Sequence, residues 1–127
     1  MHLGLFGGTF DPPHIGHLIV AEALREAFGL DRVLWMVAAT PPHKQDRRVT
    51  DAEERLALVE AAIAGNPHFE ASRLELDREG PSYTVDTLRR LHVLYPGANW
   101  SLLIGADSLA GFPSWREPAE IARLAHL

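Results

Sequence analysis

Apolar and polar positions along the chain change periodicity repeatedly, and each change marks a switch between strand and helix. Continuous apolar runs at 3–6, 33–39 and 100–105 predict buried strands, and the segment 69–76 reads as extended. Between these runs, apolar residues recur every three or four positions, as expected for helices that bury one face. The residues with this spacing are Leu18, Ala21, Leu24 and Phe28, then Leu56, Val59 and Ile63, and finally Val85, Leu88, Leu91 and Leu94.

Local signals indicate where some of these helices begin and end. Gly29 follows the first helical pattern, where a C-terminal stop belongs. Thr50 and Glu53 have the spacing of a capping box, which predicts the start of the second helix. A final crossover helix is expected at about 117–123. The predicted order of the elements up to that helix is β-α-β-α-β-α-β.

Strands that alternate with helices of this length predict an α/β fold. The sheet should be Rossmann-like, doubly wound and mostly parallel, with helices on both faces. Such sheets bind ligands at the carboxyl ends of their strands. We therefore expect one crevice lined by the loops "GGTFDPPHIGH", "TPPHK" and "GADS".

Composition narrows the class of protein. A length of 127 residues with 46% hydrophobic and 23% charged content predicts a single domain over 1–127. The formal net charge of -5 argues against a nucleic-acid partner, and the absence of cysteine excludes disulfides and thiolate metal sites. No apolar run approaches the roughly 18 residues that a membrane span needs, and the N-terminus has no basic leader. These features predict a cytoplasmic protein without a membrane partner.

The first loop has the chemistry of a phosphate site. Gly7 and Gly8 lack side chains, so backbone N–H groups can approach a phosphate chain closely. The helix that follows directs its partial positive charge to the same place. His14 and His17 share the first helical turn and can both donate hydrogen bonds to phosphate oxygens, while Gly16 leaves the space between them bare.

Two other interpretations of this loop stay open at this point. The histidines could form a zinc site together with His2, His43 or Asp11. The glycines could belong to an ordinary turn between a strand and a helix. Neither the P-loop spacing nor the dinucleotide G-x-G-x-x-G pattern is present.

The full string "GGTFDPPHIGH" resembles the signature of the nucleotidyltransferase superfamily, whose H-x-G-H element binds the triphosphate of ATP. With "PPHK", "SYTVDTL" and "LLIGADSLAGFPSW", the chain resembles the bacterial nicotinate-nucleotide adenylyltransferases along nearly its whole length. The resemblance implies that ATP and nicotinate mononucleotide react to give deamido-NAD and pyrophosphate, assisted by Mg²⁺. It implies no metal ligand among the protein side chains, because Mg²⁺ would be carried by the ATP phosphates.

The resemblance also implies roles for individual residues. The catalytic residues would be His17, His14 and Lys44. The ATP site would comprise Gly7, Gly8, Thr9, Phe10, His14, His17, Gly105, Asp107 and Ser108. The site for nicotinate mononucleotide would comprise Thr40, Lys44, Thr84 and Trp115.

Several of these residues also have plainer interpretations. Lys44 could be a solvated loop residue, Asp107 or Ser108 could cap a short helix, and Trp115 could simply pack in the core. Thr84 is well placed to be an N-cap. Arg47 and Arg48 in the second loop receive no role, and the sequence does not indicate an oligomeric state.

Three rival functions follow from the same motifs. Phosphopantetheine adenylyltransferases and cytidylyltransferases share the first motif, but the later motifs favour the pyridine nucleotide. A nucleotide-binding module without catalysis is the third, because the family usually continues with another strand and an arginine-bearing turn, whereas this chain stops at "IARLAHL". We accordingly expect a longer native polypeptide, and a sheet edge left unpaired in the 127-residue chain.

Overall fold

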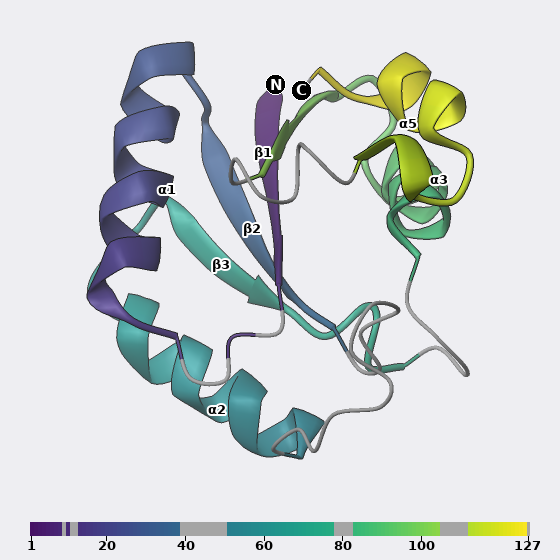
Figure 1. The fold of residues 1–127 in the computed structure, drawn as a ribbon. Helices are drawn as coiled ribbons and strands as arrows, with labels where there is room; N and C mark the ends of the chain where they lie inside the picture. The colour runs from purple at the N-terminus through teal and green to yellow at the C-terminus, as the bar shows by residue number, and fades with distance from the viewer. Residues whose placement is uncertain (9, 11–12, 39–50, 78–82, 105–111, 127) are drawn as a thin grey trace.

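The computed structural model describes residues 1–8, 10, 13–38, 51–77, 83–104 and 112–126 (Figure 1). One sheet forms the centre, and helices cover both of its faces. The elements in chain order are β1 (His2–Gly8), α1 (Ile15–Phe28), β2 (Arg32–Val37), α2 (Ala52–Ile63), β3 (Phe69–Ser72), α3 (Thr84–Leu94), β4 (Asn99–Leu103), the 3-10 turn η1 (Phe112–Ser114) and α5 (Pro118–Leu124).

The sheet has four strands in the order β3-β2-β1-β4, and every neighbouring pair is parallel. Leu5 at the middle of β1 lies opposite Leu34 of β2 on one side and Leu102 of β4 on the other. The predicted doubly wound parallel sheet is confirmed. Because parallel strands end together, the carboxyl ends of β1 and β2 meet at one edge of the sheet.

Each face of the sheet carries its own hydrophobic core, because successive strand residues point to opposite sides. Phe6 and Trp35 pack with Val59 on the face covered by α1 and α2. Leu5 and Leu34 belong to the second core, on the face covered by α3 and α5. Both faces are buried, and this explains why the strands read as continuous apolar runs rather than as alternating ones.

The ends of several elements differ from the predicted ones. β1 continues through Gly7 and Gly8, which pair with Met36 and Val37, so the two glycines belong to the strand rather than to the turn. Glycine adopts many backbone conformations with similar ease, so the hydrogen bonds to β2 determine the extended conformation of these two residues. The extended segment predicted at 69–76 is correct only to Ser72, because 74–77 form a turn.

The predicted helix ends are partly confirmed. Gly29 ends α1 with a left-handed backbone, φ 62°, as expected. The N-cap of α2 is Asp51, which makes no side-chain cap bond, while Thr50 lies outside the described residues. Phe28 and Leu94 are 51% and 48% exposed, so their assignment to buried stripes was wrong. Each is the last residue of its helix.

The outer side of β4 is partly paired in the structure. After α5, the N–H of His126 donates to the carbonyl of Trp100 at 2.8 Å, and the carbonyl of His126 accepts from Leu102 at 2.6 Å. These bonds form a parallel bridge opposite Ser101. The expectation of an unpaired edge was therefore wrong at this position.

A buried arginine ties α2 to the carboxyl edge of the sheet. Arg55 is 1% exposed, and one of its guanidinium N–H groups donates to the carbonyl of Ala38 at 2.6 Å. The N–H of Ala38 in turn donates to the carbonyl of Gly8 at 3.0 Å. Arg55 thus fixes the point where the chain leaves β2 beside the end of β1.

We predict that Arg55→Met lowers the free energy of unfolding by about 1 to 3 kcal/mol, because the hydrogen bond from the buried Arg55 side chain to the carbonyl of Ala38 is lost. Urea unfolding followed by circular dichroism measures this change. The matched control is Arg90→Met, which replaces an exposed arginine of α3 and should change stability by less than about 0.5 kcal/mol. Equal effects of the two substitutions would contradict the role given to Arg55.

Candidate active site

The candidate site lies where β1 and β2 end and α1 begins. Gly7 is exposed at the end of β1, and a Cβ added there would meet no described atom within 4 Å. α1 starts at Ile15, and its first turn faces the same edge of the sheet (Figure 1). An open strand end beside a helix N-terminus is the arrangement that binds anions in parallel sheets.

His14 and His17 form a reciprocal capping box at the start of α1. The backbone N–H of Gly16 donates to Nδ1 of His14 at 3.1 Å, and the backbone N–H of His14 donates to Nδ1 of His17 at 3.0 Å. Since each Nδ1 accepts a hydrogen bond, a neutral ring carries its proton on Nε2. The box therefore gives both rings, when neutral, the same tautomer, with an Nε2–H donor that the cap does not use.

The two rings stack closely, and Gly16 makes room for them. Their centroids are 3.7 Å apart, with an interplanar angle of 23°. A Cβ on Gly16 would lie 2.9 Å from Cε1 of His14, which is closer than real contacts allow. The structure therefore requires the bare position between the two histidines.

The environment of His17 favours its neutral form. Burial, and to a smaller extent the charge of His14, hold the pKa of His17 below its usual value of 6.5. Protonation thus favours the unfolded chain, so this contribution to stability is complete above pH 6.5 and is lost as the pH falls towards the folded pKa. If Nδ1 of His17 were protonated, it could not accept the N–H of His14. The capping box therefore also favours the neutral form of His17.

The Phe10 ring packs against the ring of His17. Its ring is 4% exposed and lies 5.1 Å from the His17 ring, edge to face at 84°, with Phe6 at 5.5 Å and Trp35 at 5.3 Å. Its backbone has φ 50°, which a non-glycine residue rarely adopts. Because the Phe10 side chain is buried among these rings, only the backbone of Phe10 is available for the predicted contact with ATP.

Gly8 leaves space for this packing. A Cβ on Gly8 would lie 3.2 Å from Cζ of Phe10. Gly8 therefore serves the core as well as any ligand. The sequence did not reveal this second reason for a glycine.

Two predicted residues lie on the other face of the sheet. Thr84 is the first residue of α3, and Tyr83 is the N-cap, so the alternative role of Thr84 as an N-cap was wrong. Trp115 is half-buried and packs against the core that includes Val85 of α3, as Tyr83 does. The N-terminal end of α3 and the segment around Trp115 are thus neighbours.

The other predicted site residues lie outside the described residues. They are Thr9, Thr40, Lys44, Gly105, Asp107 and Ser108, and the same holds for Asp11, His43, Arg47 and Arg48. The prediction that three loops line one crevice therefore stays a prediction.

The described residues contain no group of three or more His, Cys, Asp or Glu side chains that could hold a metal ion. His2 cannot join His14 and His17 in a zinc site. His2 is the first residue of β1, and its Nε2 lies 2.7 Å from Oγ of Ser101 in β4. The histidine pair lies beyond the carboxyl end of β1, about 20 Å away at 3.3 Å per residue.

A sequence family described as cytidylyltransferase-like matches residues 5–127, almost the entire chain. The chain belongs to the cytidylyltransferase-like family. The family assignment agrees with the parallel sheet and with the histidine pair at the start of α1.

The curated relatives of this chain carry the family name that the sequence motifs led us to expect. A "probable nicotinate-nucleotide adenylyltransferase" of Thermomicrobium roseum is 52% identical over 125 residues, which cover 98% of this chain and 58% of that protein. One of the same name from Salinibacter ruber is 48% identical over 122 residues, covering 96% and 63%. The chain thus spans about three fifths of the length of these relatives.

A crystal structure from Vibrio parahaemolyticus, provisionally assigned as a nicotinate-nucleotide adenylyltransferase, has the same fold. It aligns with a TM-score of 0.82 and 27% identity, over 98% of this chain and 74% of that one. The fold of this cytidylyltransferase-like chain is therefore also that of a solved relative.

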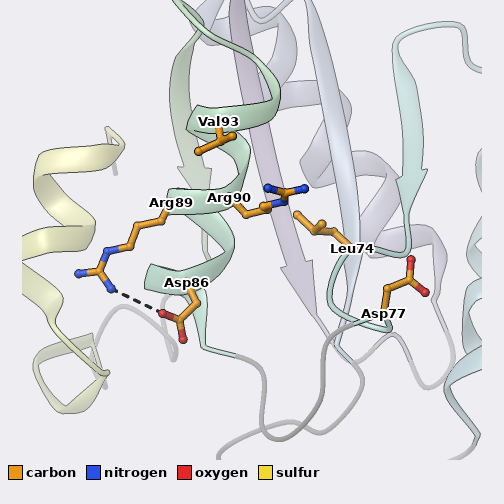
Figure 2. Close-up of a pocket in the computed structure, with 6 residues that line it drawn as sticks. All are labelled: Leu74, Asp77, Asp86, Arg89, Arg90 and Val93. Atoms are coloured by element: carbon orange, nitrogen blue, oxygen red, sulfur yellow. Dashed lines mark ion pairs between the residues drawn. The ribbon is translucent and has the colours of Figure 1, made fainter.

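A hollow of about 660 Å³ lies between α3 and the turn after β3 (Figure 2). Figure 2 shows Arg90 of α3 reaching towards Leu74 in that turn. None of the described residues that line this hollow is a predicted site residue.

None of the helices in the described part of the chain combines the length and apolar character needed to cross a bilayer.

Proposed function

We propose that this protein is a nucleotidyltransferase that transfers the adenylyl group of ATP to nicotinate mononucleotide, giving deamido-NAD and pyrophosphate in NAD biosynthesis. The observation that carries the proposal is the histidine capping box, which leaves two Nε2–H donors at a helix N-terminus beside an open strand end. The names of relatives that match 96% and 98% of this chain support the same reaction.

The chemistry requires donors rather than a base. The attacking group is the phosphate of the mononucleotide, which is already ionised at neutral pH. In-line attack on the α-phosphate of ATP spreads negative charge over its oxygens and over the leaving pyrophosphate. His17 would donate from Nε2 to the α-phosphate, and His14 and Lys44 would hold the neighbouring phosphates. The lowered pKa of His17 leaves this ring as a neutral donor at physiological pH.

Mg²⁺ suits this site as a companion of ATP. It prefers oxygen ligands, whereas the described part of the site offers imidazole and backbone N–H donors. When bound to the ATP phosphates, Mg²⁺ supplies charge neutralisation of the leaving pyrophosphate. We propose no protein side chain as its ligand.

The two substrates would occupy opposite parts of the carboxyl edge. Adenosine and its phosphates would contact the backbones of Gly7, Gly8, Thr9 and Phe10, together with Gly105, Asp107 and Ser108. The mononucleotide phosphate would meet Thr40 and Lys44. Its carboxylate would accept a hydrogen bond from the backbone of Thr84, and its pyridine ring would stack on Trp115. Such an enzyme needs neither nucleic acid nor a membrane, and we place it in the cytoplasm.

Product analysis tests this function directly. The protein is incubated with ATP and Mg²⁺ plus nicotinate mononucleotide, nicotinamide mononucleotide or phosphopantetheine, and the products are identified by mass spectrometry. We expect deamido-NAD, with kcat/KM for the nicotinate form at least about tenfold above the nicotinamide form, since a carboxylate accepts stronger bonds from backbone N–H groups. A product with phosphopantetheine alone would contradict the proposed acceptor. No product with any acceptor would indicate a nucleotide-binding module without catalysis.

Gly16→Ala tests the geometry of the histidine pair. Alanine favours helix, but its Cβ would push the His14 ring aside, so turnover should fall by about 10² while the free energy of unfolding changes by less than about 1 kcal/mol. Steady-state kinetics and urea unfolding measure the two effects. Gly65→Ala is the matched control, because its Cβ would meet no described atom within 4 Å, and it should keep full turnover. Normal turnover in Gly16→Ala would contradict the need for a bare position there.

A further inference from the structure

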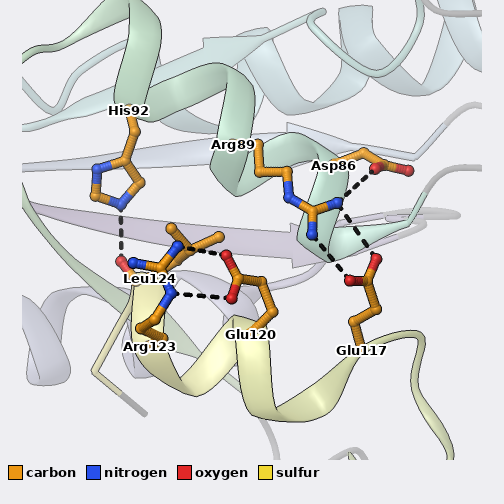
Figure 3. Close-up of polar contacts among 7 residues, drawn as sticks. All are labelled: Asp86, Arg89, His92, Glu117, Glu120, Arg123 and Leu124. Carbon is orange, nitrogen blue, oxygen red and sulfur yellow. Dashed lines mark hydrogen bonds and ion pairs between the residues drawn. The ribbon is translucent and has the colours of Figure 1, made fainter.

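Two charged contacts hold the residues after Trp115 to α3. The guanidinium carbon of Arg116 lies 4.6 Å from the centroid of the Tyr83 ring, a cation–π contact at the N-cap of α3. Arg89 donates to both carboxylate oxygens of Glu117, at 2.9 and 3.3 Å (Figure 3). The segment that carries Trp115 is therefore fastened to α3 through the two residues that follow it.

Glu117 has an unusual backbone conformation, with φ 49° and ψ 58°. Among the described non-glycine residues only Phe10 and Glu117 have positive φ, and Phe10 lies beside His17. Such a conformation persists where the surroundings fix it. At Glu117 the carboxylate is held by Arg89, and the carbonyl accepts the N–H of Ile121, the fourth residue of α5.

These ion pairs are too exposed to matter much for folding. The side chains of Arg89 and Glu117 are 44% and 47% exposed, and Asp86, which pairs with Arg89 at 3.5 Å, is 46% exposed. Pairs at this exposure contribute little to stability in water. What the Arg89–Glu117 pair does fix is where the chain turns from Trp115 into α5, relative to the first turn of α3.

We propose that Arg89 is a positioning residue for the acceptor: with Glu117 it fixes Trp115 relative to Thr84 at the N-terminal end of α3. This inference rests on the proposed function, in which Trp115 and Thr84 contact the pyridine ring and its carboxylate. Arg89 itself touches no substrate in this account. Its effect on the mononucleotide is exerted through the Trp115 segment.

The test uses steady-state kinetics on Arg89→Ala. We expect the KM for nicotinate mononucleotide to rise about three- to fivefold, the range that the loss of one exposed ion pair allows, while kcat and the KM for ATP stay within about twofold. The charge swap Arg89→Glu with Glu117→Arg should recover most of the loss, although Arg89→Glu alone should not.

Arg123→Ala is the matched control. Arg123 pairs with Glu120 inside α5, so its pair does not link α5 to α3 (Figure 3). We expect this control to keep both KM values. Acrylamide quenching of tryptophan fluorescence gives a readout that needs no turnover. Trp35 and Trp100 are 0% and 3% exposed, so quenching reports mainly on Trp115 and should increase in Arg89→Ala.

The outcomes separate the two hypotheses. If the wild-type protein makes deamido-NAD but Arg89→Ala keeps its KM for the mononucleotide, the positioning role is wrong and the proposed function stands. An equal rise in both KM values, or a failed charge swap, also overturns the positioning role. No transfer to nicotinate mononucleotide by the wild-type protein overturns the proposed function, and this inference with it.

Discussion

Two hydrogen bonds at the start of α1 determine what the candidate site can do. Each histidine of the H-x-G-H element uses its Nδ1 to accept a backbone N–H, and the pair thereby begins the helix. The same bonds fix both tautomers and leave two Nε2–H donors beside the helix N-terminus. The same two hydrogen bonds therefore cap the helix and determine which ring nitrogen carries the proton. A substitution that breaks the cap also removes this control of the tautomer.

The surroundings of the pair serve this arrangement. Gly16 allows the His14 ring to lie against the backbone, and Phe10 accepts an unfavourable φ to place its ring against His17. Phe10 in turn needs Gly8 and Trp35 around it. The central strand β1 therefore connects the candidate site to the hydrophobic core, because the residues that end it contact both.

The fold was predictable from the sequence because both faces of the sheet are covered. Buried strands such as 33–37 then read as unbroken apolar runs, and the helices between them show a single buried stripe. The burial of Phe28 and Leu94 was mispredicted, since periodicity alone does not show whether the last residue of a helix is covered. Gly7 and Gly8 were assigned to the turn for a similar reason: hydrogen bonding to β2, which sequence does not show, keeps them in the strand.

The sequence pointed to His14 and His17 as candidate residues, but it did not indicate how the two rings are arranged. The spacing of His14 and His17 indicated a shared helix face, yet histidine is not among the usual capping residues, so the sequence did not reveal the capping box. The contacts of Arg55 with Ala38 and of Arg89 with Glu117 join residues 17 and 28 positions apart, and no local pattern encodes such pairs.

The central claim is the tautomeric state of the two histidines, and nitrogen-15 NMR of the imidazole rings measures it directly. At about pH 7.5, each of the two rings should, in its neutral form, carry the proton on Nε2 because its Nδ1 accepts a backbone N–H. Addition of ATP with Mg²⁺ should shift the two Nε2 signals more than the Nδ1 signals. A proton on Nδ1 of either ring, or Nε2 signals that do not respond to ATP, would contradict the account.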